Sequence, residues 1–421
     1  MSLLKRRSFL RNAALAGAAV GSQLAWHDAI RAAAPAIQNS GKSCIFLYMN
    51  GAPSQFETFD PKAATRSETD SIPTNVAGVR FAEDLPKLSQ QAHRMCLMRS
   101  VFSREGSHPR AQYLMQSGYQ PLGGAGHPHV GAHVAQQLER DSTQLPGYIK
   151  FSIGGRRGGA GSLGGGALGV RYNPLTVSTP GKLPDNTNLT VDDKRFRRRI
   201  GLLQGLDSAN GHRQLQREVA GHVDLVQSAQ KMVTSRQMQL FQLEAESDRT
   251  RAAYGDGGFA DACLVARNLV TRAKTPFVEI NLNGWDTHDD NFARVADLCG
   301  QMDQPISQLL DDLDSSGKLD ETLVVWLGEF GRTPRVNARS GRDHFPKAFT
   351  VWLAGCGIQG GQTIGQTDKT GSEIIDRPIS IDDLLQTVYH ALGIDANEEY
   401  MDGERPLRIV EKGAPIAEAF A

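Results

Sequence analysis

The stretch PFVEINLNGWDTHDDNF, residues 276–292, decides the fold class and holds the first functional candidates. Its first half, PFVEINL, is a short apolar run rich in β-forming residues, which predicts a buried strand. Asp286 and His288 follow this strand, two residues apart. An ordinary turn requires neither side chain, so both are candidates for a site at the end of the strand.

Working outward, four more segments predict strands: 43–49, 95–102, 322–328 and 348–355. Helical periodicity separates them, most clearly at 108–118, 129–140, 259–270, 292–317 and 380–394. Strands that alternate with helices predict an α/β fold with a mainly parallel sheet and helices on both faces. Residues 192–250 are mostly helical in period and are expected to form a helical insertion.

Composition limits the classes of function. The chain has 421 residues, with 46 Lys plus Arg and 46 Asp plus Glu, so its formal charge is zero. This balance argues against a protein that holds nucleic acid by bulk electrostatics. The five cysteines are far apart and form no CxxC pair, which argues against a thiolate zinc site and leaves a single disulfide open.

The N-terminus predicts export. Arg6 and Arg7 precede Ser8, an Ala/Gly-rich stretch and small residues at 32–34, the order of a secretory signal. The arginine pair resembles the twin-arginine signal of bacteria, so we expect residues 1–34 to engage the twin-arginine export machinery and the protein to be periplasmic or extracellular. Because no apolar run reaches about 20 residues, no transmembrane segment is expected in the mature protein. Residues 40–421 are expected to form a single domain.

Polar residues follow three of the predicted strands. The carboxyl ends of parallel neighbours meet at one edge of a sheet, so these side chains are expected to lie together. The candidate ligands are Asn50, Asp286, His288, Glu329, Asp343 and His344. Carboxylates together with imidazoles suit zinc, manganese or non-haem iron. A hydrogen-bonded turn network, with Asp286 as a helix cap and Arg332 paired to a carboxylate, is the alternative.

Five longer motifs resemble the bacterial DUF1501 family of secreted proteins over residues 40–421. They are MNGAPSQFETFDPK (49–62), GWDTHDDNF (284–292), TLVVWLGEFGRTPRVN (322–337), GRDHFPKAFTVWLAGCGIQGG (341–361) and RPISIDDLLQTVYHALGI (377–394). That family is similar in fold to the alkaline phosphatase and sulfatase superfamily. The resemblance implies an α/β fold with a metal site at strand ends and action on phosphate or sulfate esters.

The resemblance also implies ligand roles. Asn50 stands where a superfamily metal-binding Asp is expected, and Glu329 and Phe330 stand where an Asp-His pair is expected. These departures weaken the second metal of the superfamily. One divalent metal (Zn, Mn, Ca or Mg), held by Asp286, His288 and His344, is therefore expected rather than two.

Catalytic roles follow from the same resemblance. The segment GSHPRAQYLMQSG (106–118) resembles the superfamily's nucleophile region, so Ser107 is the candidate nucleophile and His108 a candidate ligand or acid. Asp343 is a second candidate acid. Arg332 and Arg342 are candidates to clamp an anionic substrate, with ion pairing to nearby carboxylates as the alternative.

Two functions remain open from the sequence. The first is an exported metal-dependent hydrolase-like protein that acts on a small anionic phosphate or sulfate ester. The second is a non-catalytic exported protein of the same fold that binds a partner or an envelope glycan. The absence of the superfamily's ligand residues at Asn50 and Phe330 favours the second function. The presence of Asp286, His288 and His344 favours the first.

Overall fold

The computed structural model describes residues 41–65, 67–121, 126–140, 144–154, 163–187, 191–209 and 216–420. Residues 41–421 form one compact unit. The predicted export signal at 1–34 and much of the Gly-rich segment 153–169 lie outside the described residues.

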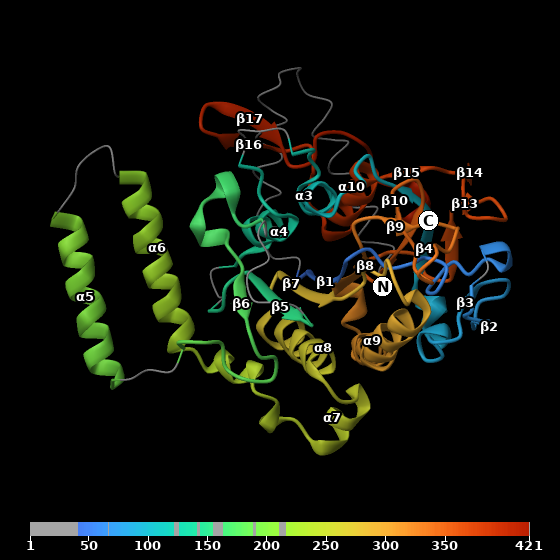
Figure 1. Ribbon diagram of the computed structural model, residues 1–421. Coiled ribbons are helices and arrows are strands. Elements are labelled where there is room, and N and C mark those ends of the chain that lie inside the picture. Colours follow the sequence, from blue (N-terminus) through green and yellow to red (C-terminus); the bar gives the residue numbers. More distant parts are fainter. Residues whose placement is uncertain are drawn as a thin grey trace, which may run out of the picture. The chain divides into compact units, whose positions relative to one another are not determined.

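A mainly parallel sheet forms the centre of this unit (Figure 1). Its strand order is β12-β4-β11-β8-β1-β7-β5-β6, and β15 also pairs with β4. The bounds are β1 Ser43–Asn50, β4 Cys96–Phe102, β5 Tyr148–Ile153, β6 Leu175–Val177, β7 Phe277–Asn283, β8 Thr322–Leu327, β11 Phe349–Ala354, β12 Gln362–Ile364 and β15 Ile379–Ser380.

The central strands β1, β7 and β8 are buried along nearly their whole length, as expected for strands with helices on both faces. β1 pairs in parallel with β7 on one side and with β8 on the other. β11 runs antiparallel to both β8 and β4. The sequence-based prediction of a mainly parallel α/β sheet is confirmed. All five predicted strands differ from the observed bounds by one residue, β1, β4 and β8 at one end and β7 and β11 at both ends.

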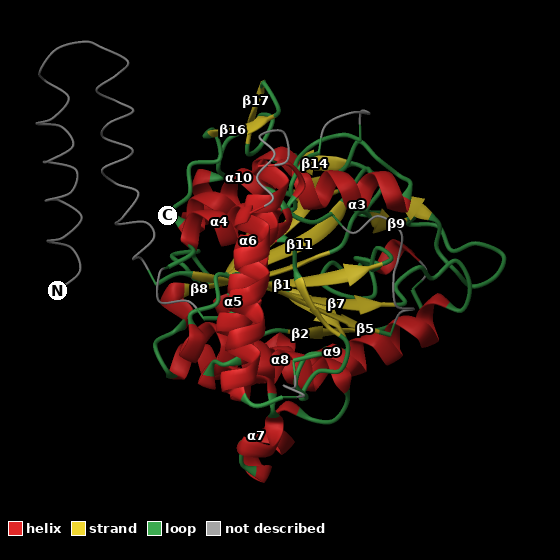
Figure 2. Cartoon of the chain, turned by 90° about the vertical axis from the view of Figure 1, so that its left-hand side faces the viewer, coloured by secondary structure: helices red, strands yellow, loops and turns green. Residues whose placement is uncertain are grey.

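Helices cover both faces of the sheet (Figure 2). α8 (Gly258–Asn268) packs against β7 and β5, and α9 (Asn291–Ser315) packs against α8. On the other face, α4 (Val130–Leu138) contacts β7 and β5, α10 (Ile381–Leu392) contacts β8, and α3 (His108–Ser117) contacts α10. α3 ends at Gly118 in the left-handed conformation, as its Gly stop signal predicts.

The predicted helical insertion contains α5 (Asp193–Ala209) and α6 (Gln216–Val233), which contact one another. After α6 the chain continues through short 3-10 turns to α7 (Asp248–Tyr254), rather than through the longer helix that periodicity indicated. Four small hairpins complete the described strands: β2 (Ser71–Pro73) with β3 (Arg80–Ala82), β9 (Gly331–Arg332) with β10 (His344–Phe345), β13 (Gln366–Thr367) with β14 (Ile374–Asp376), and β16 (Glu399–Asp402) with β17 (Arg405–Arg408).

All five cysteines are buried and free, so the disulfide that the sequence left open is not formed. None of the described helices has the length and apolar character needed to cross a bilayer.

Candidate metal centre

The candidate site lies where β1, β7 and β8 end. Asn50 and Asn283 are paired across the last position of β1 and β7, so the loops after these strands leave the sheet side by side. Gly51 lets them approach closely: its φ is +112°, and a Cβ atom there would lie 2.5 Å from the Asp286 backbone nitrogen. The first turn after β1 is therefore packed directly on the residue that carries the candidate carboxylate.

The connection that follows β8 contains the hairpin of β9 and β10, which brings His344 to the same place. β9 and β10 pair antiparallel so that His344 lies opposite Arg332. Gly341 packs against the backbone of His288, where a Cβ atom would lie 2.0 Å from the carbonyl oxygen. This contact holds together two loops whose residues, His288 and Gly341, are 53 positions apart in sequence.

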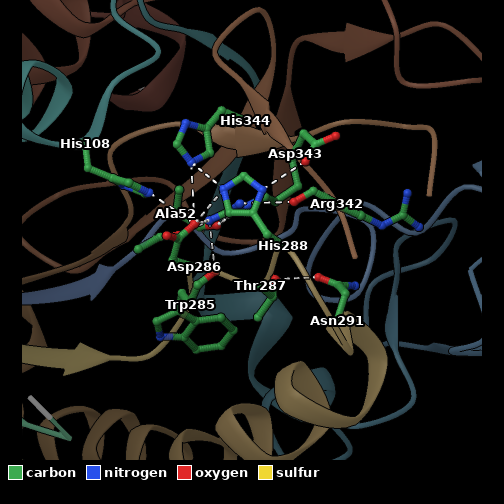
Figure 3. A network of polar contacts seen from close by, with 12 residues as sticks. Ala52, His108, Trp285, Asp286, Thr287, His288, Asn291, Arg342, Asp343 and His344 are labelled. Carbon is green, nitrogen blue, oxygen red and sulfur yellow. Dashed lines mark hydrogen bonds and ion pairs between the residues drawn. The ribbon is translucent and has the colours of Figure 1, made fainter. Parts of the chain in front are cut away.

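Four nitrogen atoms converge on one oxygen, Asp286 Oδ1 (Figure 3). The Nε2 atoms of His108 and His288 lie 3.2 Å from it, and Nε2 of His344 lies 3.4 Å from it. Arg332 Nη2 donates to the same oxygen at 2.7 Å. His108, Asp286 and His344 have the spacing of a metal-ligand group.

Each imidazole is oriented by a bond to its other nitrogen. Nδ1 of His108 contacts Glu329 Oε1 at 2.7 Å, and Nδ1 of His288 contacts Asp343 Oδ1 at 2.9 Å. Nδ1 of His344 donates to the Gly106 carbonyl at 2.8 Å. Oxygen acceptors therefore hold the proton on Nδ1 in all three rings and direct Nε2 to the common centre. Metal-binding histidines are typically held in this way.

The shortest contact between two of these rings requires a positive species. Nε2 of His288 lies 3.0 Å from Nε2 of His344. Two unprotonated ring nitrogens at this separation would repel one another, so a proton or a metal ion must lie between them. The donor set of imidazoles and one carboxylate fits zinc or manganese better than magnesium or calcium, which prefer oxygen ligands.

The charges of the site are strongly coupled. Burial opposes protonation of His108, but its hydrogen bonds to Asp286 and Glu329 raise the pKa of the imidazole to about 9. Burial also acts against ionisation of Asp286, yet the bonds from His108 and Arg332 lower the pKa of this carboxyl well below its usual range. Burial lowers the pKa of His344, against its bond to Gly106. Without metal, His108 is thus a cation held between two carboxylates.

Three predicted ligands make contacts around this centre but do not contact the shared oxygen Asp286 Oδ1. Glu329 is fully buried and accepts from the backbone N–H of Gly51 at 3.1 Å as well as from His108. Asp343 contacts His288 rather than the shared oxygen. Asn50 bonds to Asn283 Oδ1 and to Gln112, both at 2.6 Å. As placed in the structure, these residues orient histidines or their supports.

The prediction that Arg332 and Arg342 clamp a substrate is wrong for this structure, because both guanidinium groups are fully buried and occupied. Arg332 donates to Asp286 and to the carbonyls of Ala52 and Arg342. Arg342 forms a two-pronged ion pair with buried Glu57, at 3.0 and 2.7 Å. The alternative of internal ion pairing is the one observed: Arg332 pairs with Asp286 of the predicted cluster, and Arg342 pairs with Glu57, which the sequence did not indicate.

Ser107 is exposed and directly precedes the site histidine of α3. It occupies the cap position of this ten-residue helix, but its side chain makes no capping hydrogen bond. Its hydroxyl therefore remains available at a helix N-terminus, where backbone N–H groups and the helix dipole favour an anion.

Sequence reasoning missed two supports of the site. Gln112, one turn after His108 on α3, donates to Asn50 and to Glu329. Asn283, which accepts a hydrogen bond from Asn50, donates in turn to the carbonyl of Ile153 at the end of β5. The i, i+4 spacing of His108 and Gln112 could have placed both on one helix face, but their shared partner only becomes visible in three dimensions.

Comparison with known families gives one match. The model of the family described as "Protein of unknown function (DUF1501)" covers residues 41–420. This chain therefore belongs to the DUF1501 family. Among curated proteins, none matches the chain.

Several solved structures are similar at low identity. Ps i-CgsB has a TM-score of 0.44 at 11% identity, covering 90% of this chain and 76% of that one. The phosphonate monoester hydrolase of Agrobacterium radiobacter has a TM-score of 0.42 at 10% identity, covering 90% and 77%. A protein in the alkaline phosphatase superfamily from Vibrio parahaemolyticus has a TM-score of 0.38 at 12% identity, covering 90% and 70%.

Proposed function

From the premise of DUF1501 membership and the geometry of its own site, we propose that this protein is a metal-dependent hydrolase acting on phosphate or sulfate esters. The observation that carries the proposal is the 3.0 Å separation of Nε2 of His288 and Nε2 of His344 beside the ionised Asp286. A divalent cation at this point would replace the repulsion of two ring nitrogens by two coordinate bonds and would balance the carboxylate.

The chain's own residues would hold the metal as follows. His288 and His344 supply imidazole nitrogens, and Asp286 supplies a carboxylate oxygen. His108 is the fourth donor once it loses its proton, because its Nε2 already points at the same oxygen. When bound, the metal supplies Lewis-acid polarisation of an ester oxygen and lowers the pKa of a water molecule or hydroxyl group.

The exposed hydroxyl of Ser107 is the side chain proposed to attack the ester, with water as the alternative nucleophile. In either case the attacking oxygen forms a bond to phosphorus or sulfur as the bond to the leaving alcohol breaks. The backbone N–H groups of His108 and Arg110 at the start of α3, on either side of Pro109, which has none, are suited to hold the anionic ester oxygens. They take the place of the arginine clamp that the sequence suggested.

A substrate screen tests the proposal. Phosphate monoesters, phosphate diesters and sulfate esters are offered to the purified protein with zinc, manganese, magnesium, calcium or iron in turn. We expect metal-dependent turnover that Asp286→Ala abolishes, since loss of metal activation raises the barrier by several kcal/mol. Ser107→Ala abolishes turnover if Ser107 is the nucleophile and leaves a residual rate if water is. If the turnover rate of the parent protein never exceeds that of Asp286→Ala for any ester, the hydrolase proposal is rejected and the non-catalytic binding protein is preferred.

We also propose that the protein is exported by the twin-arginine pathway and works in the periplasm or outside the cell. The support is the sequence order of Arg6, Arg7 and the small residues at 32–34. Replacing both arginines with lysine is expected to retain the full-length protein in the cytoplasm. Unchanged export of that variant in a cell-fractionation assay would exclude the twin-arginine route.

A further inference from the structure

The insertion helix α5 has a charge distribution that the proposed hydrolysis does not use. The whole chain is electrically balanced, with 46 basic and 46 acidic residues. α5, however, contains five basic residues and two acidic ones, and the two acidic residues, Asp193 and Asp207, lie outside the stretch 194–206 that holds all five basic residues. The basic side chains, Lys194, Arg195, Arg197, Arg198 and Arg199, are all exposed. A group of exposed positive charges on one part of an otherwise neutral protein forms a local surface that attracts anions.

These charges surround an exposed aliphatic side chain. Leu202 is 63% exposed, the largest value among the exposed large hydrophobic residues that lie in described regions. Arg195, Arg198 and Arg199 precede it by seven, four and three residues, and positions with these spacings lie on one face of an α-helix. Added Cβ atoms at Gly201 and Gly205 would meet no atom within 4 Å, so the surface around Leu202 is open.

Two other apolar residues of α5 with described side chains occupy a different face. Phe196 and Ile200 are half-buried and stand four residues apart. By the 100° that each residue advances around an α-helix, this pair lies across the helix from Leu202. Phe196 and Ile200 therefore define an apolar face that does not include Leu202.

We propose that α5 docks this protein on an anionic lipid surface. Guanidinium groups form two-pronged hydrogen bonds with lipid phosphates, and a cluster of such groups binds a negatively charged bilayer. The exposed leucine distinguishes a bilayer from a soluble polyanion. A leucine among arginines gains free energy by entering the boundary between headgroups and acyl chains, whereas a hydrophilic polyanion offers it no apolar environment.

The test uses the full-length purified protein and co-sedimentation with vesicles. Vesicles of phosphatidylcholine with phosphatidylglycerol are compared with vesicles of phosphatidylcholine alone. We expect binding only to the anionic vesicles, weakened by added salt. The triple variant Arg195→Gln/Arg198→Gln/Arg199→Gln is expected to lower the partition coefficient roughly a hundredfold, since each arginine near such a surface contributes to binding by a factor of about five.

Two matched controls separate the site from general effects. The triple variant Arg249→Gln/Lys369→Gln/Lys412→Gln removes the same charge from exposed positions outside α5 and is expected to bind like the parent. Leu202→Ser is expected to weaken binding with the charge intact, whereas Leu225→Ser, at an exposed leucine of α6, is not.

Three results would overturn the proposal. The first is absence of binding to anionic vesicles. The second is an equal loss in both triple variants, which would show that only net charge matters. The third is binding to soluble dextran sulfate that matches vesicle binding and is unaffected by Leu202→Ser, which would show that α5 binds a polyanion rather than a bilayer.

Discussion

Glu329 provides a test of how the site is organised, because it contacts a proposed ligand without being one. Its Oε1 atom accepts from His108 Nδ1 at 2.7 Å, from Gly51 N–H at 3.1 Å and from Gln112 Nε2 at 3.3 Å. Glutamine at this position can place its single carbonyl oxygen where Oε1 lies and keep all three contacts. The substitution Glu329→Gln therefore removes the charge and preserves the shape.

Above pH 9, where His108 is unprotonated in both proteins and proton competition no longer differs between them, the expected effect is a loss of metal affinity of about 10- to 100-fold, which is the usual result of changing a residue that orients a ligating histidine. This corresponds to about 1.4 to 2.7 kcal/mol of binding free energy. A second effect is expected on the metal-free protein. The pKa of His108, which the two carboxylates raise to about 9, should fall towards its ordinary value when one carboxylate is neutralised.

Isothermal titration with zinc and manganese measures the affinity, and NMR of the ring protons of His108 measures its pKa. Asp303→Asn is a matched control, because Asp303 is a buried carboxylate that accepts backbone N–H groups of Lys87 and Leu88 and contacts no histidine of the site. Metal affinity in Glu329→Gln equal to that of the parent, with the control also unchanged, would refute the orienting role.

Three further outcomes are expected. His108 must lose a proton to bind metal, so metal affinity should rise with pH up to about 9 and metal binding should release a proton. Titrations in buffers of different ionisation enthalpy measure this proton release. A metal affinity that does not change with pH below 9 would contradict the prediction. Glu57→Gln leaves a buried guanidinium without its charge partner and should cost about 3–5 kcal/mol in denaturant unfolding, while a cost under about 1 kcal/mol would disprove the importance of the pair. Gly341→Ala should displace the His288 backbone and abolish metal binding, whereas Gly201→Ala, at a position with no atom near the added Cβ, should not. Equal metal content in both variants would contradict the claim that packing of Gly341 on His288 positions the site.

The sequence predicted the parts of this site that depend on strand ends. Asp286 and His288 follow β7 directly, and parallel pairing with β1 fixes where that loop leaves the sheet. His344 was a candidate because it lies fifteen residues after Glu329 and because the family resemblance implies a histidine ligand there; the hairpin of β9 and β10 that brings it to the site was not predicted. For Asp286 and His288, periodicity and the rule for parallel sheets were sufficient.

The rest of the site depends on packing that no local pattern encodes. The i, i+4 relation of His108 and Gln112 places them on one helix face, but not against Glu329. The burial of Arg332 was also hidden, because its partners are mostly backbone carbonyls, which every residue carries. An arginine after a strand has the same local signature whether it faces a substrate or the interior of the protein.

The metal content of the purified protein tests the central claim most directly. The measurement is elemental analysis after dialysis first against buffer that contains the metal and then against buffer without it. It compares the parent with His288→Ala, His344→Ala and His390→Ala. We expect near-stoichiometric zinc or manganese in the parent and in His390→Ala, an exposed histidine outside the site, and little in the two site variants. Equal metal in all four proteins, or none in the parent, would contradict the account and would leave a proton between His288 and His344 as the explanation of their contact.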